Sequence, residues 1–110
     1  MIEEKYKIDI CDYVRSAQPD DVVVDLREPY IFEFGTLKGA INIPLAEIRR
    51  LYSLPRDRKI YVFCQVGRLS EETVELLLDA GYEAYHLAGG YREYLRRVLE
   101  KEPPDVPGGA

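Results

Sequence analysis

The sequence predicts an α/β fold built on a five-stranded, mainly parallel sheet flanked by helices on both faces. Strand-like and helix-like segments alternate along the chain, which is typical of this class. The segment 22–26 is β-branched and apolar around one aspartate, which indicates a central strand covered on both sides. A second apolar run, 60–63, ends at Cys64 and is followed by a short loop and a helical segment. Because ligands bind at the carboxyl ends of parallel strands, Cys64 lies where a site is expected.

Capping residues and the spacing of apolar side chains give the boundaries of the elements. Asp9 is expected to cap an amphipathic helix over 9–17, after a short strand at 6–8. Pro29 suits the first turn of a short helix that Gly35 ends, and Pro44 is expected to open a further helix. The other predicted elements are an extended piece at 39–43, a helix at 70–80, a strand at 84–87 and a helix at 91–101.

Length and composition limit the classes of function. The 110 residues predict one domain over 1–102, followed by a flexible tail rich in proline and glycine at 103–110. A net charge of −5 argues against a nucleic-acid partner. No apolar run approaches the roughly 18 residues that span a membrane, and without a leader the chain is expected in the cytoplasm. One histidine and two distant cysteines form no ligand cluster, so we expect no metal and no cofactor, with a monomer favoured.

Cys64 is the candidate nucleophile. A strand that stops at a thiol and turns into a helix directs backbone N–H groups and the positive end of the helix dipole at the sulfur. These donors favour the thiolate and an anion bound beside it. A free cysteine can also end a core strand as a small buried residue, but the glycine-bearing loop 65–70 favours the nucleophile.

Four short motifs, in this order and at this spacing, resemble those of a single-domain rhodanese, a sulfurtransferase, over about residues 4–100. They are the motif DLREP at 25–29, the segment FGTLKGAINIP at 34–44, the Cys64 loop, and LAGGY at 87–91. The segment 61–67 is especially similar to rhodanese modules fused to coenzyme A disulfide reductases. The resemblance implies the rhodanese-like fold and a sulfur-transfer activity.

The resemblance also implies a mechanism and a set of site residues. Cys64 is expected to take the outer sulfur of thiosulfate or a persulfide, and to pass it as a persulfide to a thiol, to cyanide or to a protein. Asp25 and Arg27 are expected to support the site as a structural pair, with direct substrate contact as the alternative. The expected anion cradle consists of the loop residues Gln65, Val66, Gly67, Arg68, Leu69 and Ser70.

The chain departs from the family pattern at three places. Arg68 and Leu69 stand in swapped order, so we expect the guanidinium to point away from the bound anion. Thr36 replaces the usual histidine. Glu71 and Glu72 place two carboxylates near an anion site, and each costs a bound anion about 0.6 kcal/mol at ~7 Å in high dielectric. These carboxylates predict weak activity with thiosulfate and better activity with a neutral or protein-bound persulfide donor.

Three further residues have a structural interpretation. Ser70 is expected to be the N-cap of the next helix, with donation to the persulfide as a secondary role. His86 is expected to be structural, because the sequence shows no partner acid. Cys11 is expected to be a packed or surface thiol, with a disulfide to Cys64 as the minor alternative.

Other functions stay open beside the sulfurtransferase. One is a non-catalytic rhodanese-like binding or regulatory module, and another is a persulfide carrier in a protein relay. A phosphatase of related fold is disfavoured, because its loop needs an arginine six positions after the cysteine and this chain has Ser70 there.

Overall fold

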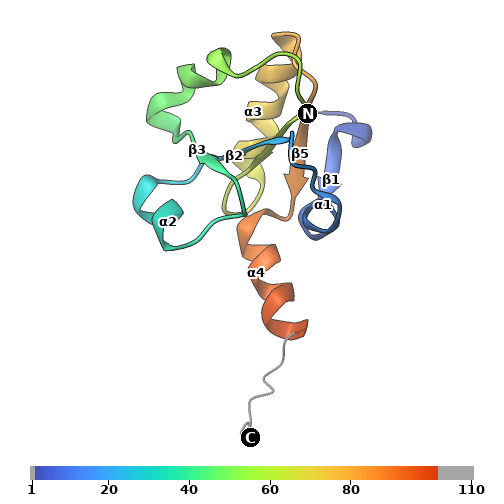
Figure 1. Ribbon diagram of the computed structural model, residues 1–110, viewed down its shortest axis with the longest axis vertical. Helices are drawn as coiled ribbons and strands as arrows, with labels where there is room; N and C mark the ends of the chain where they lie inside the picture. The colour runs from blue at the N-terminus through green and yellow to red at the C-terminus, as the bar shows by residue number, and fades with distance from the viewer. Residues whose placement is uncertain (1, 102–110) are drawn as a thin grey trace, which may run out of the picture.

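The computed structural model, which describes residues 2–101, contains one sheet with the strand order β1-β5-β4-β2-β3 (Figure 1). All four pairings between neighbouring strands are parallel, which confirms the predicted α/β class and the five-stranded sheet. The strands are β1 (Lys7–Asp9), β2 (Val22–Asp25), β3 (Ile41–Asn42), β4 (Ile60–Phe63) and β5 (Ala84–Ala88).

Helices cover both faces of the sheet, as predicted. The helices are η1 (Glu4–Tyr6, 3-10), α1 (Ile10–Ser16), α2 (Pro29–Phe34), η2 (Leu45–Ser53, 3-10), α3 (Arg68–Asp79) and α4 (Gly90–Lys101). One core contains side chains from α3 and η2, such as Val74, Leu77 and Leu51, together with Cys64. The other core contains residues of α1 and α4, such as Ile10 and Tyr91. We call these the α3 face and the α1/α4 face.

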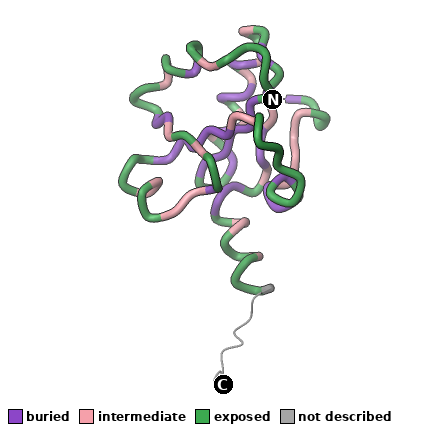
Figure 2. Tube along the Cα trace, viewed as in Figure 1, coloured by how far each residue is buried: buried purple, intermediate pink, exposed green. Residues whose placement is uncertain are grey.

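Strands β2 and β4 form the buried centre of the sheet, which is purple in Figure 2. Successive side chains of a strand point to opposite faces, so Val62 and Cys64 lie on the α3 face while Phe63 lies on the α1/α4 face. Residues aligned across the sheet share a face, and Val62 is aligned with Val24 on β2 and His86 on β5. This alignment places His86 on the same face as Cys64.

The predicted capping by Asp9 is confirmed, because its carboxylate accepts the N–H groups of Cys11 and Asp12 at 3.1 Å each. The segment after Pro44 differs from the prediction: it forms a 3-10 helix with a break at Glu47 (φ −117°, ψ 28°). Its apolar residues therefore do not share one buried face. Leu51 is buried, whereas Leu45 and Tyr52 are exposed.

The predicted tail at 103–110 and residue 102 lie outside the described residues, so the domain boundary stays a prediction. Within residues 2–101, no helix is both long and apolar enough to cross a membrane.

Candidate active site

Cys64 directly follows β4 at the carboxyl edge of the sheet, as the sequence predicted. Its side chain is 5% exposed and packs on the α3 face. The sulfur is nevertheless surrounded by donors rather than by apolar atoms alone. The N–H of Gly67 lies 3.1 Å from Sγ, and the N–H of Ser70 lies 3.4 Å from it. Backbone donors directed at sulfur stabilise negative charge there, which is the chemistry that a nucleophilic thiol needs.

Gly67 makes this loop geometry possible. Its φ of +102° is in the left-handed region, where side chains other than glycine are strained. The left-handed residue turns the chain sharply enough for α3 to begin at Arg68. The first turn of α3 then lies over Sγ, so that the N–H of its third residue, Ser70, reaches the sulfur.

The first turn of α4 fixes the other side of the Cys64 loop. The N–H of Tyr91 donates to the carbonyl oxygen of Cys64 at 2.9 Å, and the N–H of Arg92 donates to that of Gln65 at 3.0 Å. A trans peptide points its C=O and N–H in opposite directions, so the N–H groups of Gln65 and Val66 point away from α4. Gly90 permits this contact, because a Cβ there would lie 2.4 Å from the Gln65 oxygen.

The sequence predicted a cradle of six loop residues, and the structure shows two of them, Gly67 and Ser70, donating backbone N–H groups to the sulfur. Arg68 and Leu69 begin α3, and no acceptor in the described part of the chain takes their N–H groups. Arg68, Gln65 and Val66 are exposed. The backbone N–H groups of Arg68 and Leu69 therefore remain available to an anion bound beside Cys64.

The predicted N-cap role of Ser70 is wrong. The N-cap position belongs to Gly67, and Ser70 is the third helical residue with 0% exposure. The helix starts two residues earlier than predicted, because the left-handed Gly67 ends the loop. The Ser70 hydroxyl instead lies 3.6 Å from Cys64 Sγ and 2.8 Å from His86 Nδ1.

His86 is a site neighbour that sequence reasoning missed. Its imidazole is 5% exposed and reaches Cys64 through Ser70. Its polar partner comes from α3 and is a hydroxyl, so a search of the sequence for a partner acid could not find it. The signal that the sequence did offer was the alternation of side chains along the strand 84–88. It places His86 on the same face of the sheet as Ala84.

Asp25 and Arg27 form a buried ion pair on the α1/α4 face. The Arg27 guanidinium donates to Asp25 at 2.7 Å and also to the carbonyl of Gly35, and it stacks 4.1 Å from the Tyr91 ring centre. Thr36 donates its hydroxyl to Asp25 at 2.8 Å. The geometry matches the structural role: the pair joins the end of β2 to the loop after α2 and to α4.

The two acidic residues after the loop differ in their surroundings. Glu71 is half-buried and lies 3.7 Å from the Nζ of Lys7 on β1, whereas Glu72 is exposed. Part of the negative charge predicted to oppose an anion is therefore balanced by Lys7.

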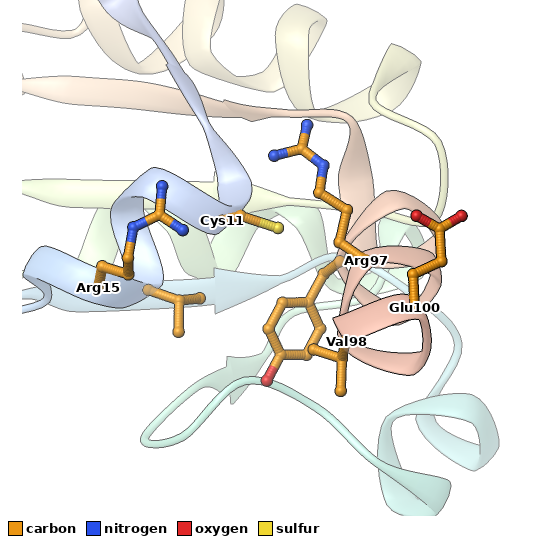
Figure 3. Close-up of a pocket in the computed structure, with 7 residues that line it drawn as sticks. Cys11, Arg15, Arg97, Val98 and Glu100 are labelled. Atoms are coloured by element: carbon orange, nitrogen blue, oxygen red, sulfur yellow. The ribbon is translucent and has the colours of Figure 1, made fainter. Parts of the chain in front are cut away.

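Cys11 lies apart from Cys64. It belongs to α1 and to the core on the α1/α4 face, and both thiols are free, so the minor alternative of a disulfide is not formed. Figure 3 shows Cys11 at a cavity of about 500 Å³ between α1 and α4. The cavity lining includes Arg15, Arg97 and Val98 and no residue of the Cys64 loop. Among residues 2–101, no three His, Cys, Asp or Glu side chains are grouped as a metal site.

The fold is a parallel α/β domain with a cysteine loop at the carboxyl edge of its sheet. Backbone N–H groups of Gly67 and of Ser70 in α3 are directed at the thiol. Comparison with known proteins identifies the family. The rhodanese-like domain family matches residues 12–97, and the chain belongs to that family.

Solved structures of rhodanese proteins are similar over most of the chain. A rhodanese-related protein of Thermoplasma volcanium has a TM-score of 0.76 and 32% identity, over 83% of this chain and 91% of that one. The CoADR-RHD protein of Bacillus anthracis has a TM-score of 0.68 and 35% identity, over 84% of this chain but 16% of that one. A human single-domain sulfurtransferase has a TM-score of 0.69 and 27% identity, over 84% and 96%. The predicted similarity to modules fused to coenzyme A disulfide reductases is confirmed.

The curated relatives are named as tRNA uridine(34) hydroxylases and not as sulfurtransferases. A tRNA uridine(34) hydroxylase of Acinetobacter baumannii is 37% identical over 98 residues, which cover 81% of this chain. The chain spans about 30% of the length of that relative.

Proposed function

We propose that this protein is a sulfurtransferase that carries a sulfane sulfur as a persulfide on Cys64. One observation carries the proposal: in a chain of the rhodanese-like family, the Cys64 sulfur accepts two backbone N–H groups at the carboxyl edge of the sheet. The fold and family support sulfur transfer in general. The donor, thiosulfate or a persulfide, and the acceptor, a thiol, cyanide or a protein, are part of the proposal. So is a cytoplasmic setting, which keeps Cys64 reduced.

The reaction has two half-reactions that share one covalent intermediate. The Cys64 thiolate attacks the outer sulfur of thiosulfate, an S–S bond forms on Cys64, and the bond to the sulfonate sulfur breaks. Sulfite leaves with the bonding electron pair. An acceptor nucleophile then attacks the outer sulfur of the persulfide, and Cys64 leaves as a thiolate.

The residues of the loop act on the charges of these steps. The N–H groups of Gly67 and Ser70 hold the charged sulfur of Cys64. The N–H groups of Arg68 and Leu69, which lack a protein acceptor among the described residues, are placed to stabilise the outer sulfur or the departing anion.

Turnover with cyanide tests the proposal. The protein is mixed with thiosulfate, or with a small persulfide, and thiocyanate formation is followed. Cys64→Ser abolishes thiocyanate formation, whereas the matched variant Cys11→Ser keeps it. Loading of Cys64 without turnover indicates a carrier in a protein relay, and no loading with any donor indicates a non-catalytic binding module.

The curated relatives favour a second candidate, a part in tRNA uridine hydroxylation, because they are 34–37% identical over most of this chain. The chain covers about 30% of those proteins, and its net charge of −5 disfavours contact with a polyanion. Binding to tRNA and hydroxylated uridine in that tRNA, measured by mass spectrometry, distinguish this candidate from the sulfurtransferase.

A further inference from the structure

A continuous hydrogen-bonded chain joins the Cys64 thiol to an imidazole. Cys64 Sγ lies 3.6 Å from Ser70 Oγ, and Ser70 Oγ lies 2.8 Å from His86 Nδ1. The three side chains are 5%, 0% and 5% exposed, so little water competes for these bonds. We propose that His86 is a positioning residue that takes up the Cys64 thiol proton through the Ser70 hydroxyl and then holds the thiolate through the same hydroxyl.

The hydroxyl can serve both states because it is a donor and an acceptor at once. With the thiol protonated, S–H donates to Ser70 Oγ and the Ser70 O–H donates to Nδ1. With the thiolate, both bonds reverse: Nδ1–H donates to Ser70 Oγ, and the Ser70 O–H donates to sulfur. The heavy atoms stay in place. The Gly67 carbonyl oxygen, 3.3 Å from Ser70 Oγ, is a second and more distant acceptor that competes for the hydroxyl proton.

The proton balance is simple. The S–H electron pair stays on Cys64 as the thiolate charge, the thiol proton passes to Ser70 Oγ, and the hydroxyl proton of Ser70 passes to the lone pair of Nδ1. The resulting imidazolium can release its Nε2 proton. Among the described residues, no buried side-chain nitrogen or oxygen lacks a hydrogen-bond partner, and none donates to or accepts from Nε2. Nε2 is therefore not completely buried, although His86 is only 5% exposed, and this gives the proton an exit.

The surroundings of His86 favour its neutral imidazole, the form that has a free ring-nitrogen lone pair. Burial lowers the pKa of His86; the nearby charge of Glu71 on α3 opposes this shift and that of Lys7 on β1 adds to it. Lys7 is the β1 residue aligned with His86, and it lies 3.7 Å from Glu71. On the other side, β4 presents uncharged Val62. Lys7 and Glu71 are the charged groups that act on His86; Cys64 lies on the same face, and Tyr6 of η1, which packs on β5, borders that core.

The test measures the ionisation of Cys64 without any sulfur donor. In a Cys11→Ser background, the rate at which iodoacetamide alkylates Cys64 is measured by mass spectrometry across the pH range in which thiols ionise. His86→Asn leaves a polar partner for Ser70 that accepts no proton, and Ser70→Ala leaves the backbone N–H in place. Hydrogen bonds to charged groups are the stronger ones. We therefore expect each variant to lower the rate at neutral pH about tenfold and to move the midpoint of the profile to higher pH.

A double variant and a control decide between the relay and a general disturbance. The double variant His86→Asn, Ser70→Ala should be no slower than either single variant, because both break one path. Thr73→Val removes another buried hydroxyl of α3, which donates to Leu69 at 2.9 Å, and should leave the profile unchanged. A wild-type rate in His86→Asn, or effects of the two variants that multiply, overturns the relay.

The role in turnover rests on the proposed function, but the two can fail separately. Sulfur uptake with an unchanged alkylation profile in the variants overturns the relay and leaves the sulfurtransferase standing. A shifted profile in a protein that accepts no sulfur overturns the sulfurtransferase and leaves the relay standing.

Discussion

Replacing Gly90 by alanine should destabilise the fold and displace the Cys64 loop. A Cβ at this position would lie 2.4 Å from the Gln65 oxygen and 2.9 Å from the Cys64 oxygen, both of them backbone atoms. The φ of Gly90 is also +71°. The left-handed conformation costs about 1–2 kcal/mol in an L-residue. Forcing extra atoms into a packed contact costs about 1–3 kcal/mol more. We therefore expect the free energy of unfolding to fall by about 2–5 kcal/mol.

Gly39→Ala is the matched control. Gly39 has a φ of +78°, but a Cβ there meets no atom within 4 Å. This variant should lose only the conformational part, about 1–2 kcal/mol. Urea unfolding of both variants measures the difference, and sulfur loading of the folded protein measures the displacement of the loop. Equal stability of the two variants, or normal loading in Gly90→Ala, would refute the contact of α4 with the Cys64 loop.

Three other predictions follow from buried and charged groups. Asp25→Asn leaves Arg27 without its buried partner and should lower the free energy of unfolding, measured in urea, by about 3–5 kcal/mol. The control Asp12→Asn breaks the exposed pair with Arg15 and should lower it by about 1 kcal/mol or less. Similar losses of stability in the two variants contradict the buried pairing. Replacing both Glu71 and Glu72 by glutamine removes two charges worth about 0.6 kcal/mol each, so thiosulfate turnover should rise about eightfold at low salt. This gain should vanish at high salt, and an unchanged rate at low salt refutes the electrostatic effect. Burial lowers the pKa of His86, so the unfolded chain binds a proton at this residue more readily than the folded chain does. The free energy of unfolding should therefore fall as the pH drops below about 6.5. His86→Asn should reduce this fall, and an identical pH dependence of the variant and the wild type contradicts the shift.

The sequence carried the information for the sheet and for the position of the nucleophile. Continuous β-branched runs such as 22–24 occur where a strand is covered on both faces, and β2 and β4 are such strands. The strand that ends at Cys64 and the helix after it could therefore be placed in order. The family motifs then located Asp25, Arg27 and the loop.

Other features depend on tertiary contacts that no local pattern encodes. The start of α3 at Arg68 depends on the left-handed Gly67. Capping preferences alone therefore predicted the N-cap at Ser70, whereas it lies at Gly67. The segment 45–53 has helical spacing, but its backbone is a broken 3-10 helix. The contact of Ser70 with His86 joins residues 16 positions apart through the alignment of β4 with β5. The balance of Glu71 by Lys7 likewise joins α3 to β1.

The most direct test of the central claim locates the transferred sulfur. The protein is loaded with a small excess of thiosulfate or persulfide, digested without reductant, and its peptides are weighed before and after cyanide treatment. We expect one additional sulfur atom on the peptide that contains Cys64, removed by cyanide, and none on the peptide that contains Cys11. Additional sulfur on Cys11 alone, or on neither thiol with any donor, would contradict the assignment of Cys64 as the sulfur carrier.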